Sequence, residues 1–92
     1  MLFVNYMKID KKIELIKLGK KIKQIRLEKN LTQFELAVKI NKDQQSIQRL
    51  EKGKINPSYI YLLEVCTGLE IPFIEIFTDI DIENNTEKMG KH

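Results

Sequence analysis

The chain has few of the residues that form disulfides, metal clusters and catalytic centres. Its one cysteine, Cys66, has no partner for an internal disulfide, and its one histidine, His92, is the last residue. These counts exclude a His/Cys metal cluster, and the sequence indicates no cofactor. A nucleophile needs a histidine or an activated carboxylate beside it, and the four glycines form no phosphate-binding loop. We therefore expect no catalytic residues and no enzymatic activity.

Long apolar runs are also missing. No stretch approaches the roughly 20 apolar residues of a membrane-spanning helix. The apolar start at residues 1–4 is too short for a secretory signal and has no basic residues before it. Met7 is an alternative start. These features predict a reduced, soluble, cytoplasmic protein that has no membrane partner.

The net charge of +3 is too small to indicate a nucleic-acid partner by itself, but the charges are segregated along the 92 residues. Lysines gather in residues 11–23 and at Lys52 and Lys54, whereas most acids follow residue 63. This asymmetry predicts a basic side and an acidic far side. We interpret the lysines of residues 11–23 as a solvated helix face, of which only those near its carboxyl end or near the loop at Lys52 and Lys54 approach phosphate.

Residues 31–57 contain the clearest local signals, and these predict two short helices joined by a tight turn. Thr32 and Glu35 have the spacing of a capping box at the start of the first helix. Asn41 tolerates the left-handed conformation that often ends a helix. Asp43 can cap the second helix, and Gly53 can close it as a left-handed residue.

The second of these helices has an apolar side and a polar side. At about 100° per residue, Ile47 and Leu50 face inward. The outer side and its flanks contain Gln44, Gln45, Ser46, Gln48, Arg49 and Lys52. A solvated surface would explain this polarity. However, glutamine and arginine are the side chains that match adenine and guanine edges in the major groove, and the outer side has no acidic residue.

An ordered series of residues extends beyond these two helices. The ordered residues are Leu18-Gly19, Ile22, Ile25-Arg26, Leu31-Thr32-Gln33, Leu36-Ala37, Ile47, Leu50-Glu51-Lys52-Gly53, Asn56-Pro57 and Glu75-Ile76-Phe77. This series resembles the XRE-like family of helix-turn-helix DNA-binding domains, the type of lambdoid phage repressors and Cro proteins. The resemblance implies an all-α, compact five-helix bundle with a central helix-turn-helix in residues 11–78. An N-terminal extension (1–10) and a C-terminal extension (79–92) would flank it.

The resemblance also implies roles for individual residues. Base contacts are expected from Gln44, Gln45 and Arg49, to which the helical wheel adds Gln48. Contacts with the DNA backbone are expected from Thr32, Gln33, Ser46, Lys52, Lys54 and Asn56, and Gln33 would also brace Gln44. Arg26 and Glu51 match a structural ion pair of the family. The expected dimer interface is Phe73, Ile74, Phe77 and Ile80, with Ile76 and Phe77 at least as well suited to the core.

Several positions depart from the family pattern or extend it. Arg49 replaces a glutamine of a similar phage repressor, which favours guanine at the contacted base. Phe34 and Val38 are apolar where exposed polar residues are usual, so a terminal segment or a partner is expected to cover them. Gly68 lies where it could loosen the helix that follows Ser58. A fifth helix is expected from Pro72, and residues 74–82 and 2–6 have short strand-like patterns.

The expected function is a homodimeric, sequence-specific regulator, most simply a repressor that occludes a promoter at a near-palindromic operator in double-stranded DNA. Two alternatives share the same domain. An antitoxin would bind a toxin protein through the acidic end or the Phe34 and Val38 patch. A restriction–modification controller would lie beside methyltransferase and endonuclease genes. The sequence leaves these alternatives open.

Overall fold

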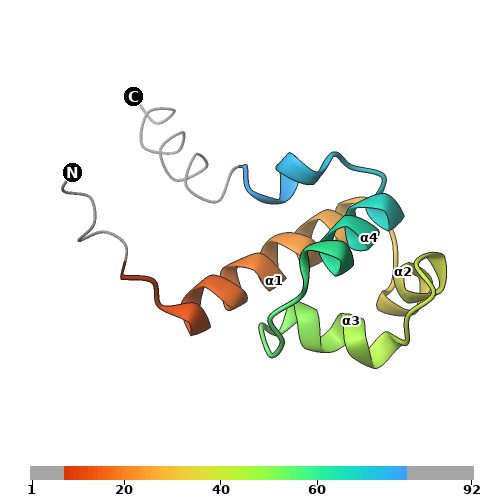
Figure 1. Cartoon of the computed structure of the whole chain (residues 1–92). Helices are drawn as coiled ribbons and strands as arrows, with labels where there is room; N and C mark the ends of the chain where they lie inside the picture. Colours follow the sequence, from red (N-terminus) through yellow and green to blue (C-terminus); the bar gives the residue numbers. More distant parts are fainter. Residues whose placement is uncertain (1–7, 79–92) are drawn as a thin grey trace.

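The computed structural model describes residues 8–78, which form four α-helices and a short 3-10 helix (Figure 1). The helices are α1 (Lys11–Glu28), α2 (Gln33–Lys39), α3 (Gln44–Glu51), α4 (Tyr59–Leu69) and the 3-10 helix η2 (Phe73–Ile76). The all-α class is therefore confirmed, and α2 and α3 form the helix-turn-helix.

The expected fifth α-helix is the 3-10 helix η2. The amide of Glu75 donates to the Pro72 carbonyl, and the amide of Phe77 donates to the Ile74 carbonyl, each at 3.0 Å. These are i to i+3 bonds, which suit a segment of only four residues. The strand-like interpretation of residues 74–77 was therefore wrong. Thr78 lies in a bend, and residues 79–82 of that pattern, together with residues 2–6, lie outside the described residues.

Side-chain caps explain where the α-helices begin. Asp10, Thr32, Asp43 and Ser58 each accept a hydrogen bond from the backbone amide three residues later. At Thr32 the capping box is complete, because the Glu35 carboxylate also accepts from the Thr32 amide at 2.8 Å. Each cap satisfies one of the amides that a helix start leaves unpaired.

Left-handed residues explain where the helices end. Asn30, Asn41, Glu70 and Gly53 have φ of 59°, 58°, 59° and 72°. The left-handed geometries predicted for Asn41 and Gly53 are thus present. Glu70 follows α4 and was not predicted, since a glutamate carries no sequence signal for this conformation.

The core is built from apolar residues of every helix. Its buried members are Ile22, Ile25, Leu36, Ala37, Ile47, Leu50, Val65, Cys66, Leu69 and Ile76. Figure 1 shows α3 along the lower edge and η2 on the far side of α1 and α4. The core therefore holds α3 at one edge of the bundle, where its other face stays exposed.

Two glycines allow helices to approach closely. A Cβ on Gly19 would lie 2.6 Å from the Leu50 carbonyl oxygen, so α1 packs directly on the backbone at the end of α3. A Cβ on Gly68 would lie 2.9 Å from a methyl carbon of Leu36, which places α4 against α2. Gly68 thus has a packing role that its position near the end of α4 did not reveal.

Gly19→Ala should destabilise the fold, because the added methyl meets backbone atoms of α3 that a rotamer change cannot move. Overpacking of this kind costs about 1–3 kcal/mol. Urea unfolding followed by circular dichroism measures the change, with the exposed neighbour Lys20→Ala as the control. An unfolding midpoint equal to that of the parent chain would contradict the close approach.

Candidate nucleic-acid interface

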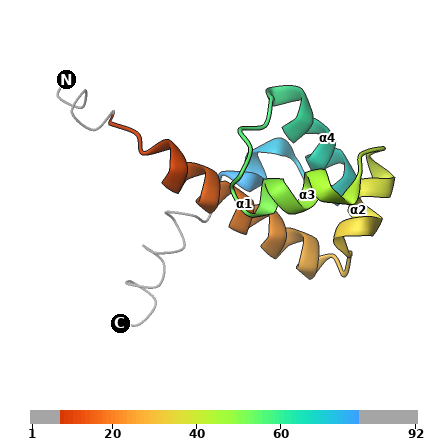
Figure 2. The same cartoon turned by 90° about the horizontal axis from the view of Figure 1, so that it is seen from below.

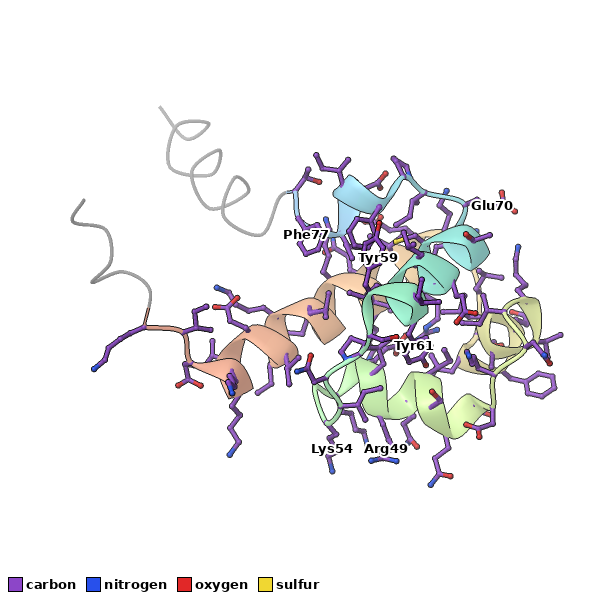
Figure 3. All side chains as sticks on the ribbon, viewed as in Figure 1. Arg49, Lys54, Tyr59, Tyr61, Glu70 and Phe77 are labelled. Carbon is purple, nitrogen blue, oxygen red and sulfur yellow. The ribbon has the colours of Figure 1, made fainter. Side chains whose placement is uncertain are left out.

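Helix α3 presents a polar face away from the bundle. Ile47 and Leu50 are buried against the core, whereas Gln44, Gln45, Gln48 and Arg49 are exposed. Figure 3 shows Arg49 and Lys54 extending from the same side of the molecule, away from the other helices. The four residues proposed for base contact therefore lie on one accessible side of a helix that is fixed by its apolar side.

The one acidic residue of α3, Glu51, is buried in an ion pair. Its carboxylate accepts from Arg26 Nε at 2.6 Å and from Arg26 Nη2 at 3.0 Å. Arg26 Nη1 donates to the Leu31 carbonyl at 2.7 Å. The expected pair is thus present, with bidentate geometry. It removes the negative charge of Glu51 from the surface that carries the glutamines.

Gln33 has a partner within the protein that was not expected. Its amide nitrogen donates to Glu51 Oε1 at 3.0 Å. The physical reason is that a buried carboxylate oxygen gains from a second donor. The amide of Gln33 has two N–H donors, so one remains for a phosphate.

Two hydroxyl groups named for DNA backbone contacts already have partners in the protein. Thr32 accepts from the Glu35 amide at 3.0 Å but can still donate its proton. Ser46 is hydrogen-bonded to the hydroxyl of Tyr61 on α4. Since one of these two hydroxyls donates to the other, the pair retains one proton for a phosphate.

Tyr61 is a residue that sequence reasoning missed. Its ring lies 5.5 Å from Lys42 Nζ, and its hydroxyl reaches α3 at Ser46. A signal was present, because Tyr61 is spaced four and eight residues before Val65 and Leu69, which face the core. Tyr61 thereby connects α4 to the start of α3.

The loop after α3 presents two basic side chains and one amide side chain to solvent. Lys52, Lys54 and Asn56 are exposed. Gly53 lies between the two lysines, and a Cβ there would be 2.8 Å from the Ile16 amide nitrogen of α1. The loop is therefore seated on α1 beside the end of α3. This position suits contacts with a DNA backbone that flanks the bases under α3.

The residues named for a dimer interface separate into core and surface. Ile76 is buried and Phe73 is half-buried, whereas Ile74 and Phe77 are more than half exposed. Phe73 packs edge-to-face with Tyr59 at 5.4 Å and with Phe77 at 5.2 Å between ring centroids. Figure 3 shows Tyr59 and Phe77 near η2. Tyr59 was not expected there, and Ile80 lies outside the described residues.

Phe34 and Val38 form a second exposed apolar patch, on α2. They are 60% and 61% exposed, so no part of residues 8–78 covers them. The expectation that a terminal segment or a partner covers them stays a prediction.

Residues 8–78 offer little for metal or nucleophile chemistry. They contain no group of three or more His, Cys, Asp or Glu side chains that could hold a metal ion. Burial, together with the nearby charge of Glu75, raises the pKa of the Cys66 thiol, which disfavours the reactive thiolate. None of the helices in this part of the chain combines the length and apolar character needed to cross a bilayer.

Comparison with known proteins identifies the family. A family model described as helix-turn-helix matches residues 22–76. The chain belongs to this helix-turn-helix family of the XRE type. No curated protein sequence matches the chain significantly.

Solved structures support the same family. The restriction–modification controller protein C.AhdI from Aeromonas hydrophila aligns with a TM-score of 0.69 at 31% identity, over 71% of this chain and 98% of its own. The controller C.Esp1396I was solved as a tetramer in complex with its natural 35 base-pair operator. It aligns with a TM-score of 0.65 at 38% identity, over 68% of this chain and 83% of its own. The clp gene regulator ClgR from C. glutamicum aligns with a TM-score of 0.65 at 26% identity, over 67% of this chain and 80% of its own. These relatives and the family support a DNA-binding transcriptional regulator.

Glu51→Gln should destabilise the fold strongly, because it leaves Arg26 buried with an uncompensated charge. Removing one partner of a buried pair costs about 3–5 kcal/mol. The free energy of unfolding in urea measures this change. The matched control is Glu64→Gln, which breaks the partly exposed Lys42–Glu64 pair at 3.2 Å and should cost at most about 1 kcal/mol. Equal losses from both variants would contradict the structural role of the buried pair.

Proposed function

We propose that this chain is a homodimeric, sequence-specific transcription regulator that places α3 of each protomer in the major groove of one operator half-site. The observation that carries the proposal is the exposed side of α3, which combines three glutamines and an arginine while its one acid, Glu51, is held in a buried pair. Repression by promoter occlusion is the simplest action, and the proposal gives the chain no catalytic step.

The chemistry of the exposed side suits base reading. Glutamine amides can make paired hydrogen bonds with adenine, and an arginine guanidinium can make them with guanine. Gln44 and Gln45 lie in the first turn of α3, and Arg49 lies in its last turn. A recognition helix contacts base edges mainly through its N-terminal residues. We therefore assign Gln44 and Gln45 to the central contacts and Arg49 to a guanine at the edge of the half-site, with Gln48 as a further base contact.

Backbone contacts would fix the protein on the duplex. Lys52, Lys54 and Asn56 are on the loop beyond α3, and Thr32 and Gln33 are at the start of α2. Contacts of this kind orient the helix but carry no sequence information. Each phosphate that a lysine neutralises releases counterions, so the affinity should fall steeply with salt.

A two-fold symmetric operator requires two protomers, and the apolar surface around η2 can join them. Tyr59, Ile74 and Phe77 are each more than half exposed, and the rings of Tyr59 and Phe77 pack on the half-buried ring of Phe73. Figure 1 places η2 on the other side of α1 and α4 from α3, so pairing there leaves the base-reading face free. Half-site centres about 34–36 Å apart would follow from the usual spacing of dimeric helix-turn-helix proteins.

A restriction–modification controller is the more specific candidate. Two such controllers align with this chain at 31% and 38% identity over more than two thirds of its length. Genes for a methyltransferase and an endonuclease beside this gene would support that assignment. A neighbouring toxin gene would instead favour an antitoxin, whose partner could cover the exposed Phe34 and Val38.

Gln45→Ala should reduce discrimination at one base pair per half-site and leave the fold unchanged, because the side chain is exposed. The expected loss is about 1–3 kcal/mol of preference for the correct base. Competition binding with duplexes that vary one base pair at a time measures this loss. Gln24→Ala, an exposed glutamine on α1, is the control. A Gln45→Ala variant with the base preferences of the parent chain would refute the assignment of the reading face.

Phe77→Glu should weaken the homodimer, because it places a charge in the proposed apolar contact. Loss of one buried phenylalanine per protomer removes roughly 1.5–3 kcal/mol each, so the dissociation constant of the dimer should rise by at least about a hundredfold. Sedimentation equilibrium measures this shift, with Phe34→Glu on the α2 patch as the matched control. If Phe34→Glu dissociated the dimer and Phe77→Glu did not, the α2 patch would be the interface.

A further inference from the structure

The amino-terminal half of α1 extends beyond the bundle beside the base-reading side. In Figure 2, which views the molecule from below, the first turns of α1 project past α3, and no other described helix covers them. The family match begins at residue 22, so this half of α1 lies outside the matched region. The family model therefore assigns no role to this half of α1.

Two glycine contacts show which face of α1 lies toward α3 and its loop. The Cα of Gly53 packs against the backbone of Ile16, where an added Cβ would lie 2.8 Å from the Ile16 amide nitrogen. Gly19 packs against the Leu50 carbonyl at the end of α3. Ile16 and Gly19 thus mark the face of α1 that meets the DNA-binding elements. Lys54 is the next residue after Gly53, so the basic loop lies beside this contact.

Lys12 continues that face past the end of α3. It lies four residues before Ile16 and seven before Gly19, a spacing that places side chains on one side of a helix. Four residues of α-helix, a rise of about 6 Å, separate it from Ile16 along the axis. Lys12 is exposed. Its ammonium group can therefore reach past the loop on the same side as Lys54.

The neighbouring acids are engaged elsewhere. Glu14 lies two residues after Lys12, which is about 160° around a helix at 100° per residue, and Asp10 is the extended N-cap residue before the helix. The Asp10 carboxylate accepts from the Ile13 amide as the helix cap, and Glu14 pairs with Lys17 at 3.5 Å. Both carboxylates thus have partners other than Lys12, and Ile16, on the Lys12 side of this segment, contacts the basic loop at Gly53.

We propose that Lys12 contacts a backbone phosphate of duplex DNA that flanks the bases read by α3, which lengthens the footprint of each protomer. The proposal rests on the proposed function. It makes specific the expectation that lysines of α1 near the basic loop approach phosphate. Lys12 is such a lysine because Gly53 seats this loop on the amino-terminal half of α1.

Lys12→Gln tests the proposal, with Lys11→Gln as the matched control. Both lysines are exposed, and they lie about 100° apart around the helix. The probes are duplexes containing a selected binding site, one cut close to the half-sites and one with about ten further base pairs on each flank. Lys12→Gln should weaken binding to the long duplex roughly three- to tenfold and lower the salt slope by about one per protomer. The advantage of the long duplex over the short one should shrink.

The control results separate this proposal from the proposed function. Lys11→Gln should keep both the salt slope and the length advantage, and Lys54→Gln should weaken binding to both duplexes. If Lys12→Gln matched Lys11→Gln while Lys54→Gln still weakened binding, the Lys12 contact would be refuted and DNA binding would stand. If the parent chain bound neither duplex, both proposals would fall. Equal thermal midpoints for the three variants establish that the fold is retained.

Discussion

The buried pair of Arg26 and Glu51 is the interaction on which the arrangement of the DNA-binding elements depends. Arg26 comes from α1 and binds both carboxylate oxygens of Glu51 at the end of α3. It also binds the Leu31 carbonyl before α2, and Gln33 of α2 binds the same carboxylate. One ion pair therefore links three helices. Because charges without partners are costly in the interior, alternative packings of α3 would carry a large penalty.

The same pair determines the electrostatics of the surface. A glutamate on the exposed side of α3 would repel phosphates, yet this glutamate stabilises the fold from a buried position. Its burial requires α1 to come close, and Gly19 permits this because any side chain there would meet backbone oxygens of α3. No buried side-chain nitrogen or oxygen in residues 8–78 lacks a hydrogen-bond partner. The hydrogen bonds between Arg26 and Glu51 therefore depend on the close packing of α1 on α3 at Gly19.

Features that depend on neighbours in sequence were predictable from the sequence. The cap at Thr32, the left-handed turn at Asn41 and the inward side of α3 each follow from residues within one or two helical turns. The Arg26 and Glu51 pair came from the family resemblance, since 25 residues separate the two in the chain. The exposure of the glutamines on α3 followed from helical phase alone.

Features that depend on tertiary contacts were not predictable in the same way. Gln33 bonds to Glu51 because the buried carboxylate has room for another donor, and the hydroxyl of Tyr61 meets Ser46 because α4 crosses near the start of α3. Gly68 gave only the signal of a weak helix end, although it serves close packing between α4 and α2. The fifth helix is a 3-10 helix because four residues are too few for stable α-helical propagation.

The most direct test of the central claim is selection of bound fragments from the source genome at moderate salt, followed by sequencing. The claim is that the exposed side of α3 reads bases in a two-fold symmetric operator. It predicts enrichment of one symmetric site with half-site centres about 10 base pairs apart or a multiple of that spacing. Binding that enriches no common site, or no binding to duplex DNA, would contradict it.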